Sequence, residues 1–293
     1  MNTRQIQYAL MLYENLNFSV VAEKLGITQP ALSKQIHNLE DELGIRLFDR
    51  STSPLTVTPA GEHFFVHAKE ILYREDQLLK SMEEFKSGER GSLVIGVSPF
   101  RCQYLLPKVI KEFKKKYPEV QVVLHEAGTD VLRKETAEGR FDFSIVNLPV
   151  DEAVLDVAPI ETDILVLAVP KEMASALPSG EHIDLSDCEN LNFVTVGKNQ
   201  EMRQLLEKSC LASGFSPKIS AEVVGISTAF ALCLEGVGAT LIPLQYVKHL
   251  GACDKVKIFK LKHNLYTRQP VIITRKGQYI SEYAKHAIKL LTE

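Results

Sequence analysis

Apolar positions in the first 45 residues recur every three or four positions, which is the period of amphipathic helices. The spacing predicts helices over residues 4–15, 19–26 and 28–43. Gly26 is placed to end the second helix, and Thr28 is a good N-cap for the third. Two short helices joined by a tight turn have the spacing of a helix-turn-helix motif.

The third of these helices has one apolar and one polar face. The residues expected to face inward are Ala31, Leu32, Ile36, Leu39 and Leu43. The residues expected on the outer stripe are Gln29, Ser33, Lys34 and His37. Exposed hydrogen-bonding side chains of this kind read base edges. An ordinary helical subdomain with a polar face fits the same spacing, so DNA binding is one of two open interpretations here.

Extended runs follow Gly44. Residues 46–50 and 55–58 flank the turn residues 51–54 and predict a small β-wing. Arg46 and Arg50 lie beside this wing and could meet phosphates.

A long helix is predicted over residues 59–85, with Thr58 as N-cap and Pro59 at the first helical position. Its apolar stripe follows a seven-residue repeat and consists of Phe64, Phe65, Ala68, Ile71, Leu72, Leu78, Leu79, Met82 and Phe85. This spacing is typical of a coiled-coil helix and favours dimerisation. Packing on its own domain is the alternative. The polar, glycine-containing segment 86–91 reads as a linker.

Strand and helix patterns alternate from Ser92 onward. The expected strands are 92–98, 120–127, 141–148, 161–170, 191–197, 218–224, 238–243 and 269–277. The expected helices are 104–118, 130–139, 199–214, 226–236 and 278–291. This alternation predicts an α/β region with a largely parallel sheet. Two lobes joined near 162–163 and again near 267–269 would enclose a cleft.

Three turns should meet at this cleft, where strands end and helices begin. They are residues 96–104, 194–201 and 223–229. Backbone N–H groups at helix N-termini suit an anion, and Arg101 in the first turn strengthens that interpretation. Taken singly, each turn is more simply explained as a capped helix start.

Composition limits the classes of protein. The chain has 293 residues, 45% of them hydrophobic and 24% charged, and a net charge of −3. Any contact with nucleic acid must therefore use a local surface. No apolar run approaches the ~20 residues that span a bilayer, and we expect no signal peptide. Together these features predict a cytoplasmic protein.

Motifs for enzymatic chemistry are missing from the sequence. It has no nucleophile elbow, phosphate-binding loop, dinucleotide-binding motif or zinc-protease motif, and we expect neither catalysis nor a cofactor or metal. The scattered cysteines are Cys102, Cys188, Cys210, Cys233 and Cys253. They suit reduced thiols, and Cys102 beside the cleft could be a redox sensor or simply a buried small residue.

The run "FSVVAEKLGITQPALSKQIHNLEDELGIRLFDR" at 18–50 and "LTVTPAGE" at 55–62 resemble the signatures of the LysR-type transcriptional regulators. The resemblance covers the whole chain. It implies an α+β and α/β multidomain fold with an N-terminal winged helix-turn-helix, a long linker helix and a two-lobed effector domain like a periplasmic binding protein. The implied boundaries are 1–58 for the DNA-binding domain, 59–86 for the linker helix, 87–91 for a hinge, 92–162 with 268–293 for lobe 1, and 163–267 for lobe 2.

The resemblance also implies partners and sites. The partners would be double-stranded promoter DNA, a small-molecule effector and further copies of the chain in a homodimer or homotetramer, without a membrane. Effector binding would reset the lobes and change how the tetramer bends DNA. The implied DNA-contacting residues are Thr28, Gln29, Pro30, Ser33, Lys34, His37, Arg50 and Ser51. The implied effector-contacting residues are Ser98, Pro99, Phe100, Arg101, Thr129, Asn147, Thr195, Gly197, Gly225, Ile226 and Ser227.

The sequence departs from the family pattern in places. The wing tip 51–54 lacks the arginines common there, which would weaken its hold on the DNA backbone. Cys210 has no partner cysteine within 201–209, so we expect no disulfide switch of the kind found in peroxide-sensing members. A second class of function stays open, namely a small-molecule binding protein or enzyme whose N-terminal module serves only assembly.

Overall fold

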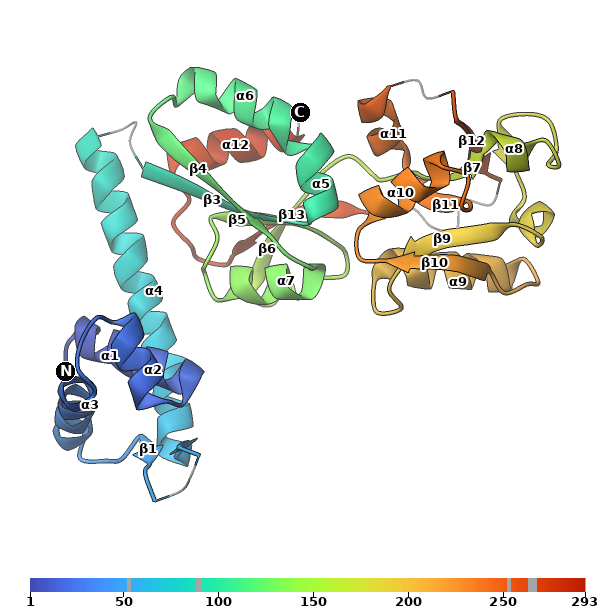
Figure 1. The fold of residues 1–293 in the computed structure, drawn as a ribbon. Coiled ribbons are helices and arrows are strands. Elements are labelled where there is room, and N and C mark those ends of the chain that lie inside the picture. Colours follow the sequence, from blue (N-terminus) through green and yellow to red (C-terminus); the bar gives the residue numbers. More distant parts are fainter. Residues whose placement is uncertain (52–53, 88–90, 252–253, 263–267, 293) are drawn as a thin grey trace. The chain divides into compact units, whose positions relative to one another are not determined.

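The structure is a computed structural model that describes residues 1–51, 54–87, 91–251, 254–262 and 268–292. The chain forms two compact units, Met1–Gly91 and Ser92–Glu293, which are described separately below (Figure 1). Within the described residues, every helix is too short or too polar to cross a membrane.

Three helices open the N-terminal unit: α1 (Thr3–Asn15), α2 (Phe18–Lys24) and α3 (Gln29–Leu43). The sequence predicted all three. Each begins at a side-chain cap, because Asn2, Asn17 and Thr28 accept hydrogen bonds from backbone N–H groups of the first turn. Gly44 ends α3 at φ 68°, a left-handed conformation that glycine adopts without steric cost.

The buried face of α3 is narrower than the sequence predicted. Leu32, Ile36 and Leu39 are buried as expected, but Ala31 and Leu43 are exposed, so the prediction was wrong for those two. Ala31 lies about 100° around the helix from Leu32, which turns it away from the core. The place next to Leu39 on the buried face is taken by a charged residue instead.

That residue is Glu40, which is 3% exposed and joins α3 to the wing. Its Oε1 accepts the backbone N–H groups of Leu47 at 2.8 Å and Phe48 at 3.1 Å, and its Oε2 accepts from Arg50 Nη2 at 3.1 Å. The wing itself is confirmed as an antiparallel pair of β1 (Phe48–Asp49) and β2 (Thr56–Val57). Part of its predicted tip, 52–53, lies outside the described residues.

The long helix α4 (Pro59–Ser87) is also confirmed and extends beyond the bundle of α1 to α3 (Figure 1). The Thr58 hydroxyl caps the N-terminus of α4 by accepting a hydrogen bond from the Gly61 N–H at 3.0 Å. Its apolar stripe divides along its length. Phe65 and Ala68 are buried in the core of the N-terminal unit. The distal positions are exposed by 41–59% and comprise Ile71, Leu78, Leu79 and Met82. The side chain of Phe85 lies outside those described.

The C-terminal unit contains a five-stranded sheet with the order β4-β3-β5-β13-β6. The strands are β3 (Gly91–Val97), β4 (Val120–Glu126), β5 (Phe143–Asn147), β6 (Leu155–Pro159) and β13 (Pro270–Arg275). Helices α6 (Leu106–Lys116) and α12 (Glu282–Thr292) cover one face, and α7 (Thr129–Ala137) covers the other (Figure 1). This layered arrangement makes the first lobe.

The second lobe combines a four-stranded sheet, ordered β11-β7-β12-β8, with a parallel pair, β9 and β10. The strands are β7 (Leu165–Pro170), β8 (His182–Ile183), β9 (Asn192–Val196), β10 (Lys218–Val223), β11 (Thr240–Pro243) and β12 (Val256–Leu261). The helices are α8 (Lys171–Ala174), η1 (Leu185–Cys188), α9 (Glu201–Ala212), α10 (Ile226–Leu234) and α11 (Leu244–Leu250). Many of their apolar side chains form one core, and those of α10 and α11 pack mainly in a second core that also includes Phe100 of α5 (Pro99–Tyr104).

The largely parallel arrangement predicted from the sequence is interrupted by one reversed strand in each lobe, while the pairs β3–β5, β9–β10 and β8–β12 are parallel. In the first lobe β13 runs antiparallel to both β5 and β6, and in the second β7 runs antiparallel to both β11 and β12. The reason is the double crossing of the chain. The reversed strands, β7 and β13, directly follow the two crossing segments, so each enters its sheet from the side of the crossing and runs against its neighbours.

The two crossing segments pair with each other. Asp163 and Arg268 form an antiparallel bridge with backbone N–O distances of 3.0 and 3.2 Å. The outward segment runs from β6 to β7 and the return segment from β12 to β13. Residues 263–267, which include the predicted crossing position Thr267, lie outside the described residues. Helix α5 adds a further link, because Phe100 packs on Tyr246 of α11 at a ring distance of 4.5 Å.

Replacing Glu40 by alanine tests its role as the link between α3 and the wing. Two buried N–H groups and Arg50 would lose their acceptor, so we expect the free energy of unfolding to fall by about 3 kcal/mol. Thermal and urea unfolding followed by circular dichroism measure this loss. Glu42→Ala, an exposed position on the same helix, is the control and should change the value by less than about 0.5 kcal/mol. Equal losses in the two variants would contradict the role given to Glu40.

Candidate functional site

The polar stripe of α3 lies on the surface of the N-terminal unit. Thr28, Gln29, Pro30, Lys34 and His37 are exposed. Ser33 lies on the same face and is partly exposed. The structure therefore brings together all six of the residues that the sequence singled out on this helix.

Arg50, beside the wing, contacts the helices α3 and α2 through its side chain. Arg50 Nη1 donates to Ser33 Oγ at 3.4 Å, and the guanidinium stacks 5.3 Å from the ring centre of Phe18. The Ser51 hydroxyl and backbone N–H both donate to Asp49, which holds the pKa of that carboxyl below its usual range. The sequence indicated that Arg50 could meet a phosphate, but it did not indicate that Arg50 also contacts Ser33 and Glu40 of α3.

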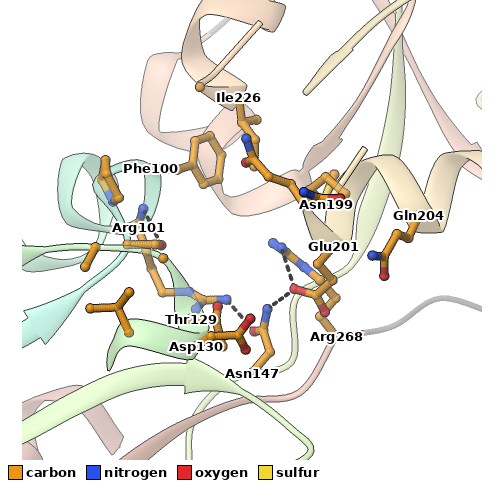
Figure 2. Close-up of a pocket in the computed structure, with 18 of the residues that line it drawn as sticks. Phe100, Arg101, Thr129, Asp130, Asn147, Asn199, Glu201, Gln204, Ile226 and Arg268 are labelled. Carbon is orange, nitrogen blue, oxygen red and sulfur yellow. Dashed lines mark hydrogen bonds and ion pairs between the residues drawn. The ribbon is translucent and has the colours of Figure 1, made fainter. Parts of the chain in front are cut away.

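A cavity of about 610 Å³ opens between the two lobes of the C-terminal unit (Figure 2). Nine predicted effector residues line it: Ser98, Pro99, Phe100, Arg101, Thr129, Asn147, Gly225, Ile226 and Ser227. Two do not. Thr195 is buried in β9 and borders a separate small cavity, and Gly197 follows β9 without lining either cavity.

Sequence reasoning missed more than half of the lining residues. They are Ala127, Gly128, Asp130, Val131, Arg133, Leu148, Pro149, Asn199, Gln200, Glu201, Met202, Gln204, Val224 and Arg268. Four of them lie in turns that were expected at the cleft: Asn199, Gln200 and Glu201 in 194–201, and Val224 in 223–229. Most of the others follow β4 and β5, whose ends were not among the predicted turns. Arg133 and Arg268 belong to a helix interior and a crossing segment, which carry no local signal.

Four helices begin at this cavity. Ser98 caps α5 by accepting the Arg101 N–H at 3.4 Å. The N-cap residues of α7, α9 and α10 are Gly128, Gln200 and Gly225, and none of them provides a side-chain cap. The first-turn N–H groups of these three helices therefore remain without a side-chain acceptor, at the positive ends of the helix dipoles.

Arg101 does not present a free positive charge, contrary to the expectation from its position. It is 4% exposed, and its Nη2 donates to Asp163 Oδ2 at 2.8 Å and to Asn147 Oδ1 at 2.7 Å. Arg268 Nη2 donates to the same Asp163 oxygen at 2.8 Å. Burial disfavours the charged form of Arg101, but the charge of Asp163 and hydrogen bonds to Asp163 and Tyr104 outweigh it and raise the Arg101 pKa.

Glu201 reaches this network from the opposite lobe. It is the first residue of α9, and its Oε2 accepts from Asn147 Nδ2 at 2.5 Å and lies 3.6 Å from Arg268 Nη1 (Figure 2). On the other side, Arg133 Nη2 donates to the carbonyl oxygen of Asn147 at 2.7 Å. The cleft floor is thus a continuous chain of ionic and amide groups that joins the two lobes.

Three of the five cysteines are poor redox centres. Burial raises the pKa of Cys102 to about 11 and the pKa values of Cys188 and Cys210 to about 12, so each is a protonated thiol at neutral pH. Cys253 lies outside the described residues. Within the described ranges there is also no group of three or more histidine, cysteine or acidic residues placed to hold a metal ion.

Two family models match the chain. The bacterial regulatory helix-turn-helix protein, lysR family, matches residues 3–62, and the LysR substrate binding domain matches residues 86–293. The chain belongs to the LysR family. As a LysR-family protein it is a DNA-binding transcriptional regulator with a substrate-binding domain. The winged helix-turn-helix is the DNA-binding part, and the two-lobed region with the cleft is the substrate-binding domain.

Known relatives agree with this assignment. The chain is 31% identical to the uncharacterized HTH-type transcriptional regulator YcgK of Bacillus subtilis, over 100% of this chain and 94% of that one. It is also 31% identical to the HTH-type transcriptional regulator AlsR of Bacillus subtilis, over 83% and 80% of the two lengths. The similarity to YcgK thus extends over both units.

Solved LysR-type structures share the fold. Full-length CbnR in complex with its target DNA aligns with a TM-score of 0.67 at 19% identity, over 99% of both chains. Full-length OxyR from Pseudomonas aeruginosa aligns with a TM-score of 0.73 at 21% identity, over 100% of this chain and 98% of that one. Both structures support the fold class predicted from the sequence.

Asp163→Asn tests the shared ion pair at the base of the LysR cleft. The change leaves two buried guanidinium groups without their common anion, so we expect the free energy of unfolding to fall by about 3–5 kcal/mol. Urea unfolding measures the loss. Asp130→Asn, which lies at the same cleft with its side chain 98% exposed, should change the value by less than about 0.5 kcal/mol. A loss below about 1 kcal/mol for Asp163→Asn would show that the pair is not essential.

Proposed function

We propose that α3 reads the operator of this regulator in the major groove. Gln29 and Ser33 would contact base edges, and Lys34 would contact a base or a phosphate. Thr28, Pro30 and His37 share that surface. Arg50 and Ser51 on the wing would approach the DNA backbone. The observation that supports this proposal best is the exposed, uncharged to basic stripe of α3.

The effector would bind in the cavity between the lobes and would carry an anionic group. Three helices begin there without side-chain caps, which favours an anion. The effector-contacting residues would include the nine predicted ones that line the cavity. We keep Thr195 and Gly197 in the proposal only as supports of the neighbouring wall, since they do not border this cavity.

Several copies of the chain would act together. The exposed distal positions of α4 offer an apolar face for dimerisation, and a homotetramer would contact two half-sites. The domain limits we propose are 1–58, 59–86, 87–91, 92–162 with 268–293, and 163–267. Effector binding would reset the lobes and change the bending of DNA. The regulator would act in the cytoplasm and without enzymatic activity, as expected from the regulators to which it is related.

Changing the reading surface should weaken specific binding. For Gln29→Ala and Ser33→Ala we expect a loss of about 1–3 kcal/mol for each base contact removed. Lys34→Ala should lower the slope of log K against log salt by about 0.9 if it meets a phosphate. Gel shifts and footprints on DNA from upstream of the regulator's own gene measure both.

Lys24→Ala is the matched control for the salt slope. Lys24 is exposed at the end of α2 and bonds to Asn15 rather than extending from the reading surface. Its removal should leave the slope unchanged. Unaltered footprints for both Gln29→Ala and Ser33→Ala would overturn the residue assignment, and absence of any specific binding would favour a small-molecule binding role instead.

An anionic effector should raise the thermal midpoint of the regulator. Small carboxylates, sulfate donors and phosphates form the screen, with sodium chloride at matched ionic strength as the control. A ligand at 100 times its Kd stabilises the folded state by about 2.7 kcal/mol, which gives a clear shift. Stabilisation by neutral or cationic compounds alone would rule out this class of effector.

A further inference from the structure

We propose that Glu201 occupies the place of the effector in the cleft. Its carboxylate contacts Asn147 and the positively charged Arg268 until a free carboxylate displaces it. The inference rests on the proposed effector-binding function and adds to it the chemical class of the ligand and a means of regulation. Glu201 would hold the lobes together in the absence of effector. An incoming carboxylate would take over its two contacts.

Glu201 reaches from the second lobe to polar groups outside it. It belongs to α9 in the second lobe, yet its bonds go to Asn147 at the end of β5 and to Arg268 in the crossing segment. Figure 2 shows its carboxylate pointing toward both groups. Asn147 is 4% and Arg268 8% exposed, whereas the Glu201 side chain is 42% exposed. The receiving groups are therefore fixed, and the carboxylate is the part that solvent and a ligand can reach.

The charges of the cleft floor are balanced only while Glu201 or another anion is present. Two guanidinium groups, Arg101 and Arg268, face two carboxylates, Asp163 and Glu201. Asp163 is buried between the arginines and cannot leave without great cost. Glu201 can leave, but its departure would leave a buried positive charge in excess. An anion must therefore replace it, and a neutral effector would leave it in place.

Donor geometry favours a carboxylate as the replacement. The Glu201 carboxylate lies 3.6 Å from Arg268 Nη1, which is longer than a hydrogen bond. A ligand carboxylate between Asn147 Nδ2 and Arg268 Nη1 could approach this group to the length of a charge-assisted hydrogen bond, about 2.7–2.9 Å. A free carboxylate can adopt this position, whereas that of Glu201 is limited by its attachment to α9. A free carboxylate can therefore bind at this site more favourably than the carboxylate of Glu201.

Chemical rescue of Glu201→Ala tests the inference on the full-length protein without the natural effector. The probe is propionate, and the uncharged propionamide of the same shape is its control. Thermal midpoints are measured against probe concentration at constant ionic strength. We expect propionate to bind the variant about tenfold more tightly than the wild type, the size of one charge-assisted hydrogen bond. Propionamide should not distinguish the two proteins.

Glu207→Ala is the matched control variant. Glu207 lies on the same helix, its side chain is 44% exposed, and it pairs with Arg203 at 2.6 Å, but neither residue lines the cavity. This variant should respond to propionate as the wild type does. Glu201→Gln keeps the shape of the side chain and removes its charge, so it serves as the second test variant if Glu201→Ala does not fold. It too should bind propionate more tightly than the wild type.

The inference is overturned if propionate binds the wild type and the Glu201 variants alike, or if propionamide rescues as well as propionate. Stabilisation of the wild type by propylammonium, lost in Glu201→Ala, would also overturn it, because Glu201 would then be a ligand for a cation. All these measurements use the protein alone. Failure of the proposed function would instead appear as loss of specific DNA binding in the gel shift, so the two failures are distinguishable.

Discussion

One carboxylate shared by two buried arginines organises the C-terminal unit. Asp163 accepts from Arg101 and Arg268, and these three residues come from the start of α5 and from the two crossing segments. Burying a guanidinium without its anion is strongly unfavourable, so each of the three side chains can be buried only when the other two are in position. The pairing of the crossing segments, the position of α5 and the floor of the cleft therefore form together. The cleft is shaped by this ionic contact as much as by the apolar cores on either side.

Around that fixed floor, the walls of the cleft have unsatisfied polar groups. Helices α7, α9 and α10 begin at the cavity without side-chain caps. Gly128 and Gly225 at two of these N-caps cost only a few tenths of a kcal/mol relative to a serine or aspartate cap, so the helix ends stay open at little cost to stability. Binding sites commonly keep such groups open for a ligand. A rigid ionic floor and receptive helix termini together explain how a ligand can be recognised from both lobes at once.

Local signals in the sequence predicted most of this fold. Thr28 and Thr58 marked helix starts because capping depends only on neighbouring residues, and the wing followed from two short runs around a turn. Arg101 was assigned to the cleft correctly, but its neutralisation was missed, because Asp163 lies 62 positions further along the chain. Thr195 was expected at the effector site from the family resemblance, yet it borders a different cavity. Strand direction, partner choice and side-chain orientation depend on packing between distant segments, which one sequence does not reveal.

The contact between Glu40 and the wing has a consequence for how DNA would be discriminated. One oxygen of Glu40 accepts from the backbone beside and within β1 and the other accepts from Arg50, so α3, which we propose to face the bases, and the wing beside it form a single stiff body. Such a body cannot adjust the spacing between its groove-facing and backbone-facing parts. The duplex must supply that spacing through its own groove width and bendability. Sequences that never touch the protein would then influence affinity through the energy of deforming the double helix.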